Sequence, residues 1–462
     1  MKQRLILTTL AVLLALGNAQ TARSQGADAI LDLLLRKGIV TEQEVKELKK
    51  EVDADLARAM ERANKGKFSS WLDAVKFSGD FRLRAEDFIF EDYRNSADRL
   101  RFRYRLRLQM DFEYQEWAKV TLRLASGEAS PGDPVSTNQS FTDTFKKKPL
   151  TIDAAYVTIQ PPHWKWLKLM GGKMDNPIWQ PKFNSPMIYD FDVTPEGAGE
   201  VLEYDFGDRS QYRLFGQFGQ FVLKEVSGNS RDPYLFDLQG GFQAGFGGDL
   251  PKKPKLKLTA AGGYFFTHNL SNSSYTYGDS PNTGNANGSG SSTNNWLADF
   301  RVVYGRGEIA YVIREQPFLG TPPVLTLGGE VDCNIKNEYD TLIGSAQTLD
   351  KNQTLGWTVQ LAFGEAKKKG QWQVSYQYKH LEADAVWDAL TDSDWGTGGT
   401  DRKGHIIKGV YNMTDWWQLA CTVFLTEKIS QRPNSGHNTV GGIGADHGQD
   451  MLRLQVDSSF KF

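Results

Sequence analysis

The chain has 462 residues and a formal net charge of -2 at pH 7, with a pI near 6.4. This balance argues against a general nucleic-acid binder, so we expect no nucleic-acid partner. The 45 glycines and the 12% of aromatic residues are typical of a β-rich chain with many turns. Its two cysteines, Cys333 and Cys421, lie far apart and do not indicate a disulfide framework.

Residues 1–19 have the features of an export signal. Lys2 and Arg4 precede an apolar run at 5–17 that is too short to span a bilayer comfortably, and small residues follow it. We predict cleavage after Ala19. The rest of the chain contains no other run of about 18 apolar residues, so we expect no transmembrane helix in the mature protein.

Residues 20–70 are predicted to form a helical segment. Gly38 is a natural end for a first helix, and Thr41 with Glu44 forms a capping box that begins a second. The second helix carries an apolar stripe, but a strict heptad fails at Asp55. Self-association as a coiled coil and a hairpin that packs on itself both remain open.

The stretch 98–112 alternates arginines with apolar residues. A helix would scatter these arginines around its axis, whereas a strand points successive side chains to opposite faces. The stretch is therefore predicted to be a strand with one basic face and one apolar face. Taken alone, it fits a soluble sandwich with its arginines in water, or a membrane barrel with its arginines in an aqueous lumen.

From residue 77 to the C-terminus, predicted strands alternate with connections that are long and short in turn. This alternation of long and short connections is typical of outer-membrane barrels. It predicts about 16 antiparallel strands, with both barrel termini on the side of the short turns. Such a number of strands encloses an aqueous channel. The last strand ends on alternating apolar residues, and Phe460 and Phe462 resemble the assembly signal of bacterial outer-membrane barrels.

In a barrel, the basic face must line the lumen, because a lipid-facing arginine near the bilayer midplane costs about 2–4 kcal/mol. The candidate pore-lining residues are Arg82, Arg84, Arg99, Arg101, Arg103, Arg105, Arg107, Lys119 and Arg123. Such a wall repels itself unless carboxylates face it. We expect the segment 172–197 to fold into the lumen and to supply some of them; the candidate acidic residues are Asp80, Glu86, Asp175, Asp190, Asp192 and Glu196.

Other chemistry has little support in the sequence. The chain has six histidines and contains neither a Gly-x-Ser-x-Gly nor a His-Glu-x-x-His motif, so we predict no enzyme activity and no cofactor or metal. Asp392, Asp394 and Asp401 could gather around calcium, but solvated loop acids explain them as well. Both cysteines fall on apolar strand faces and are expected to be chemically idle.

Several motifs together resemble the putative porin family of Gram-negative outer-membrane barrels. They are LLLRKGIVTEQE, FRLRAE, DRLRFRYRLRL, RLASGEASPGDPVSTNQSF, IDAAYV, GGKMDNP, DFDVTPEG and the terminal Phe462. The resemblance covers most of the mature chain and is densest over 77–200. It implies a 16-stranded barrel at 77–462 in the outer membrane, preceded by a periplasmic segment at 20–70. It further implies a homotrimer among lipid and lipopolysaccharide, inserted by the barrel assembly machinery.

The leading hypothesis is a porin that lets small anionic or neutral hydrophilic solutes diffuse passively, with mild anion preference, because rings of arginine favour anions. A narrower alternative is a phosphate- or carboxylate-selective channel that uses bidentate arginine contacts. A third possibility is a structural or adhesive barrel with the helical segment as a tether.

Overall fold

The computed structural model describes residues 75–90, 98–127, 133–228, 230–270, 299–336, 353–396, 398–429 and 450–462. The chain divides into two units, Met1–Ala74 and Val75–Phe462. The predicted export signal at 1–19 and the predicted helical segment at 20–70 both lie outside the described residues.

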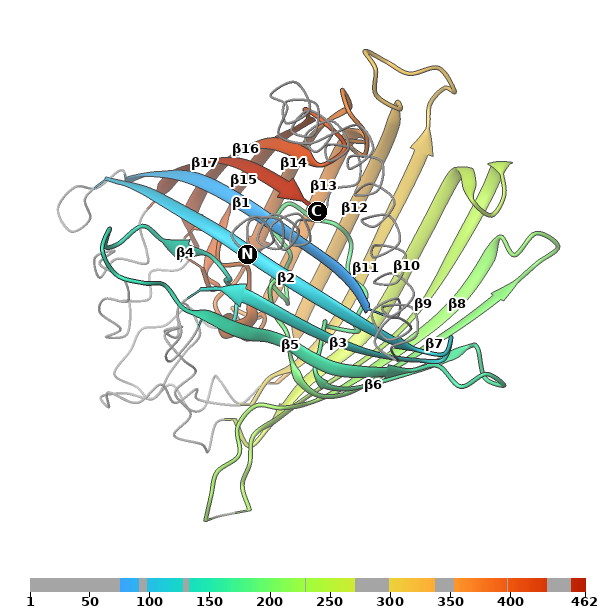
Figure 1. Cartoon of the computed structure of the whole chain (residues 1–462), viewed down its shortest axis with the longest axis horizontal. Coiled ribbons are helices and arrows are strands. Elements are labelled where there is room, and N and C mark those ends of the chain that lie inside the picture. Colours follow the sequence, from blue (N-terminus) through green and yellow to red (C-terminus); the bar gives the residue numbers. More distant parts are fainter. Residues whose placement is uncertain are drawn as a thin grey trace, which may run out of the picture. The chain divides into compact units, whose positions relative to one another are not determined.

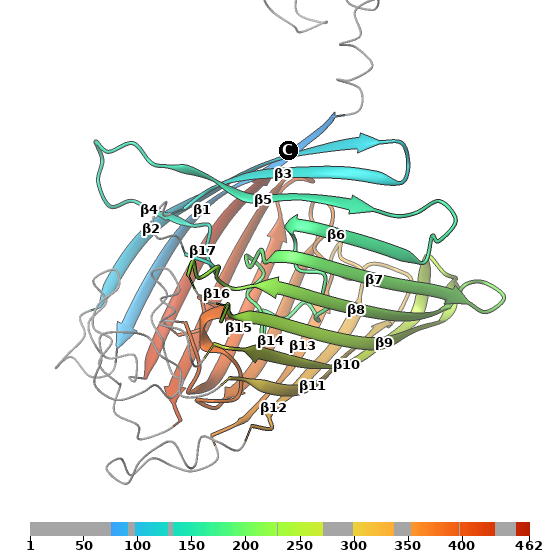
Figure 2. The same cartoon turned by 90° about the horizontal axis from the view of Figure 1, so that it is seen from below.

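The unit Val75–Phe462 is a closed antiparallel β-barrel (Figures 1 and 2). Its strands are β1 (Val75–Phe90), β2 (Arg99–Tyr114), β3 (Ala118–Ser126), β4 (Gln139–Ser140), β5 (Leu150–Ile159), β6 (Leu167–Lys173), β7 (Glu196–Phe206), β8 (Tyr212–Val222), β9 (Tyr234–Asp249), β10 (Lys253–His268), β11 (Arg301–Val312), β12 (Val324–Asn334), β13 (Leu355–Gly364), β14 (Trp372–Leu381), β15 (Arg402–Asn412), β16 (Trp417–Lys428) and β17 (Met451–Lys461).

Every long strand pairs with the next one along the chain, and β17 pairs back with β1 to close the ring. The two-residue β4 only extends the edge of β2, so 16 strands form the barrel, and the predicted barrel of about 16 antiparallel strands is confirmed. In the described ranges, the 3-10 turn η1 (Asp388–Leu390) is the one helical element. No helix of those ranges is long and apolar enough to cross a membrane.

Connections at one end of the barrel are long, and those at the other end are mostly tight turns, as the sequence rhythm predicts. The pattern of long and short connections did not reveal the connections at 91–97, 223–233, 250–252 and 313–323. Two of these flank β9, where Gly240, Gly241 and Gly245 leave gaps in the apolar alternation that marks a strand.

The strand faces follow the alternation. On β2, Leu100 and Phe102 are 63% and 49% exposed on the outer surface, whereas Arg101 and Arg103, which alternate with them, are partly buried inside. Cys421 is exposed and Cys333 half-buried, and both are unpaired thiols. The outer surface is therefore the apolar one, as lipid contact requires.

The C-terminal residues of β17 and Phe462 pair with β1 where the barrel closes. Gly79 N donates to Phe462 O at 2.8 Å, Phe462 N donates to Gly79 O at 3.1 Å, and Phe460 stacks on Trp417 with ring centroids 5.8 Å apart. A Cβ on Gly79 would lie 2.6 Å from the Phe462 ring, so only glycine leaves room for this closure. The role of Phe460 and Phe462 as an assembly signal stays a prediction.

The two faces of β15 provide a test of the orientation. Ile407, in the middle of the strand, is 47% exposed on the outer surface, and its neighbour Lys408 points inward. Ile407→Arg should lower the free energy of unfolding by about 2–4 kcal/mol, because it places a charge in lipid near the midplane. Lys408→Arg, at the same depth, should change it far less. Urea titration in lipid vesicles measures both, and equal losses would contradict the assigned faces.

Candidate functional site

The inner faces of β1 and β2 form a basic wall. In the register of these strands, Asp80 lies opposite Arg107 and Glu86 lies opposite Arg101. Between these two mixed pairs, arginine faces arginine, in the pairs Arg82 with Arg105 and Arg84 with Arg103. Directly opposed like charges destabilise a sheet, so this central part of the wall needs carboxylates from elsewhere.

The segment 174–195, between β6 and β7, supplies some of them from inside the barrel. Its tip reaches the far wall: Asn184 N donates to Gln360 Oε1 at 2.6 Å, and Ser185 N donates to Gln377 Oε1 at 2.9 Å. Lys379 Nζ donates to the carbonyl of Pro186 at 2.7 Å. Because these partners lie on β13 and β14, across the ring from β6 and β7, the segment crosses the lumen.

A second inserted segment, 382–401 between β14 and β15, packs against the first. Asp190 N donates to Leu390 O at 2.8 Å, and Ser393 N donates to Asp190 Oδ2 at 3.0 Å. The two segments bury an apolar cluster together with inward residues of several strands; its members include Val135, Met187, Ile188, Tyr189, Phe221, Leu235, Phe265, Val302, Tyr304, Leu381, Val386, Trp387 and Leu390. Part of the lumen is thus a packed core.

Carboxylates from both segments reach the basic wall. Asp192 lies 3.4 Å from Arg105 and 3.3 Å from Arg107, which also share Asp80 at 2.8 and 2.7 Å. Asp394, from the second segment, lies 2.6 Å from Arg84 and 3.0 Å from Arg453. These contacts neutralise much of the wall.

The strands add further carboxylates. Glu86 lies 2.6 Å from Arg101 and 2.7 Å from Arg453, and Asp457 of β17 lies 2.6 Å from Arg84. Arg453 and Asp457 were not among the predicted site residues, although both fall on the polar face of the predicted last strand. That face was the signal that could have identified them.

The remaining candidates occupy the neighbouring wall. Arg123 contacts Asp153 and lies 2.7 Å from Asp175, and Lys119 lies 3.4 Å from Asp111. Arg99, at the start of β2, lies opposite Phe88 in the register. Glu196 lies 3.5 Å from Lys173 rather than beside the basic wall.

The acidic residues of the inserted segments do not all act alike. Among the described residues, Asp190 contacts no arginine and instead accepts from the backbone N–H groups of Asp192 and Ser393. Asp394, considered above as a calcium ligand, is engaged by Arg84 and Arg453. Over the described ranges, no group of three or more His, Cys, Asp or Glu side chains is arranged to hold a metal ion.

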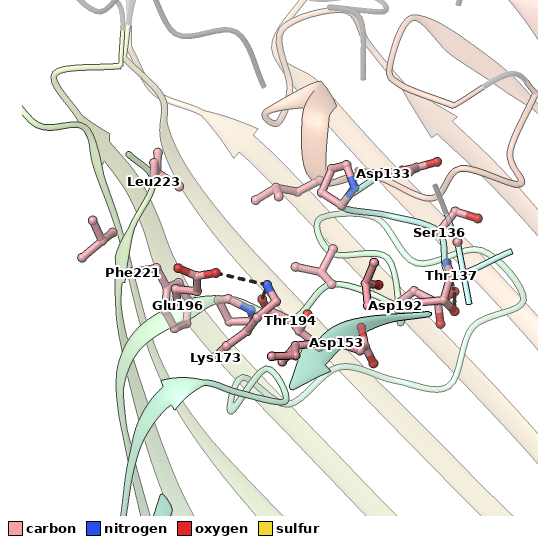
Figure 3. A pocket seen from close by; sticks show the side chains of 18 of the residues that line it. Asp133, Ser136, Thr137, Asp153, Lys173, Asp192, Thr194, Glu196, Phe221 and Leu223 are labelled. Carbon is pink, nitrogen blue, oxygen red and sulfur yellow. Dashed lines mark hydrogen bonds and ion pairs between the residues drawn. The ribbon is translucent and has the colours of Figure 1, made fainter. Parts of the chain in front are cut away.

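A cavity of about 410 Å³ opens beside the inserted segments (Figure 3). Ser136, Thr137 and Asp192 line one side of it, Asp153 lies below them in the view, and Lys173 lies with Glu196 near Phe221. The Asp192 carboxylate accepts from Thr137 Oγ1 at 3.2 Å while it also contacts the arginines. The cavity therefore adjoins the basic wall through Ser136, Thr137 and Asp192.

Burial and neighbouring charges together shift the pKa values of the inserted acids, upwards at Asp190 and downwards at Asp192 and Asp394. Burial raises the pKa of Asp190 well above its usual range, and the nearby Asp392 and Asp192 raise it further. Burial also acts to raise the pKa of Asp192, but Arg105 and Arg107 outweigh it and hold that pKa below the usual value. Arg84 and Arg453 likewise outweigh burial at Asp394 and hold its pKa well below the usual value.

The family model described as putative porin matches residues 93–291 and 320–460, which is most of the chain. The chain belongs to the putative porin family. The comparison with curated proteins finds no match.

Solved barrels resemble this putative porin at low identity. Pseudomonas putida OprB is 11% identical, with a TM-score of 0.48 over 86% of this chain and 96% of OprB. Vibrio cholerae OmpT in its trimer form is 13% identical, with a TM-score of 0.43 over 84% and 99%. A mutant of Rh. blastica porin is 10% identical, with a TM-score of 0.41 over 84% and 100%.

The junction of the inserted segments in this putative porin should depend on pH. Because the pKa of Asp190 is higher in the folded protein than the usual value near 3.9, its ionisation opposes the packing. The junction should therefore tighten as the pH falls from 7 towards 5, a range in which Asp192 and Asp394 stay ionised. Hydrogen exchange at the amide of residue 190, corrected for the intrinsic rate, should show protection rising over this range.

Asp190→Asn is the control for this pH dependence. Asparagine cannot ionise and keeps an oxygen for only one of the two N–H groups, because Asp192 N donates to Oδ1 and Ser393 N donates to Oδ2 of Asp190. Lys379 of β14 then interacts with Asp392 without the charge of residue 190. Protection in the variant should be independent of pH between 5 and 7. The same slope in both proteins would show that Asp190 is not the titrating group.

Proposed function

We propose that the protein is an outer-membrane porin through which small hydrophilic solutes diffuse passively. The observation that carries this proposal is the inward row of arginines on β2, next to a polar cavity inside a closed barrel. A packed barrel interior has no need for this many charged side chains, whereas an aqueous passage can use them. Membership of a porin family also favours transport over catalysis.

The proposed passage has mild anion preference. Arginine-lined constrictions favour anions. Carboxylates of Asp80, Glu86, Asp192, Asp394 and Asp457 offset much of this field, so the preference is modest rather than strict. Neutral and small anionic solutes are the expected cargo.

The sequence and the family support a proposed setting for the pore. We propose that residues 1–19 direct export, that 20–70 lie in the periplasm, and that 77–462 span the outer membrane among lipid and lipopolysaccharide. The C-terminal strand ending at Phe462 would be recognised by the barrel assembly machinery. The assembly is proposed to be a homotrimer.

A structural barrel is the second candidate, and the apolar cluster beneath the inserted segments is the observation that favours it. A barrel whose lumen is partly filled by a packed core could serve as a rigid support with little permeability. Conductance separates the two functions.

The test of the porin function is conductance of the purified full-length protein in a planar bilayer under a KCl gradient. We expect discrete steps of current from open channels. The reversal potential should be displaced from zero towards the equilibrium potential of chloride. Replacing Arg101, Arg103 and Arg105 by glutamine should move the reversal potential towards cation preference, because Glu86 and Asp192 then each lose one counter-charge in direct contact, although others remain. The size of this shift in the reversal potential should fall at high salt, where charges are screened.

Asp192→Asn is the matched change of opposite sign. It should move the reversal potential further to the chloride side, because Arg105 and Arg107 then share only Asp80. Absence of conductance from protein that still shows the heat-dependent gel shift of a folded barrel would reject the porin function and support the structural one.

A further inference from the structure

Two arginines of the basic wall, Arg82 and Arg103, differ from their neighbours. Arg84, Arg101, Arg105 and Arg107 each lie within 4 Å of at least one carboxylate. The contacts of Arg82 and Arg103 with the described residues are to neutral oxygens alone.

The strand register explains why, among the described residues, no carboxylate contacts these two arginines directly. Arg82 lies between Arg105 on β2 and Ser459 on β17. Arg103 lies between Arg84 on β1 and Ser140 on β4. Neither neighbour of either arginine is acidic, and the inserted carboxylates bind other arginines.

Both guanidinium groups converge on one neutral residue. Arg82 Nη2 donates to Asn138 Oδ1 at 2.7 Å, and Arg103 Nη2 donates to Asn138 O at 3.3 Å and to Ser136 Oγ at 3.3 Å. In addition, the Nε groups of both arginines are buried without a hydrogen-bond partner in the described part of the chain. Two positive charges thus share a small set of uncharged acceptors.

Such an arrangement favours an anion. Hydrogen bonds to a charged acceptor are roughly twice as strong as those to a neutral one, and the planar fork of arginine matches the oxygens of carboxylate and phosphate groups. Asn138 Oδ1 and Ser136 Oγ occupy the positions that two oxyanion oxygens would take. Ser136 also lines the cavity described above, so only the Ser136 side chain would separate a solute at that point from Arg103.

We propose that Arg82 and Arg103, with Ser136 and Asn138, form a discrete binding site for a small oxyanion that carries a carboxylate or phosphate group. The anion displaces the neutral oxygens and supplies a negative charge in direct contact with both guanidinium groups. This inference rests on the proposed transport function, because the lumen is the route to the site, and it gives the mild anion preference a location.

The experiment is isothermal titration calorimetry of the folded full-length protein in detergent at low salt, with inorganic phosphate in one arm and acetate in the other. Binding in the phosphate arm, the acetate arm or both supports the site and identifies the preferred headgroup. Arg82→Gln and Arg103→Gln should each weaken binding by about tenfold or more, since each removes charge-assisted hydrogen bonds. No saturable binding of either anion to the native protein would overturn the inference.

Asn138→Asp is the decisive variant. It places a carboxylate between the two arginines, so it should abolish binding of both anions while the barrel stays folded. It also keeps the test valid if an arginine variant fails to fold. Unchanged affinity in Asn138→Asp would overturn the site.

Arg213→Gln is the matched control for the loss of one arginine. Arg213 of β8 lies 2.6 Å from Asp205 and 3.1 Å from Glu203, away from the basic wall, and its replacement should leave binding unchanged. Weakening equal to that of Arg82→Gln would show a general charge effect and reject a discrete site. Binding without bilayer conductance would reject the porin function alone, whereas conductance without binding would reject the site alone.

Discussion

One electrostatic constraint governs the interior of this barrel: arginines that cannot face lipid must find counter-charges inside the lumen. The spacing of two residues on β2 places the guanidinium groups on one face, and the cost of a lipid-facing arginine makes that face the inner one. The strands β1 and β17 supply Asp80, Glu86 and Asp457, which is too few for the wall. The inserted segments supply Asp192 and Asp394, so their positions depend on the same constraint.

The apolar cluster is what allows flexible connections to deliver charge accurately. A carboxylate on a loose loop would lose conformational entropy each time it reached an arginine. Met187, Tyr189 and Trp387 are almost fully buried beneath the two segments, and Lys379 holds the carbonyl of Pro186. Packing thus fixes the backbone of the segments, and the ion pairs then form between groups that are already in place.

The sequence predicts the strands of this protein better than the contacts inside it. Alternation alone assigns β1, β2, β3 and β17 with their faces, because the period of two is a local property of each strand. The glycines of β9 interrupt that period, which is why the connections beside it were not found. Asp190 and Asp394 illustrate the other limit. Both are inserted acids, yet only Asp394 reaches arginines, since the fold of each segment depends on contacts with distant strands.

The packed core and the basic wall together restrict where a solute could pass. The apolar cluster covers inward residues such as Phe265, Val302 and Leu381 on β10, β11 and β14. The cavity instead adjoins Thr137, Asp153 and Asp192, on the side of β3 and β5. In the proposed porin, this cavity would bring a solute beside the arginines of the basic wall. The proposed path along this charged wall would let a few side chains determine selectivity, because solutes would pass within reach of them.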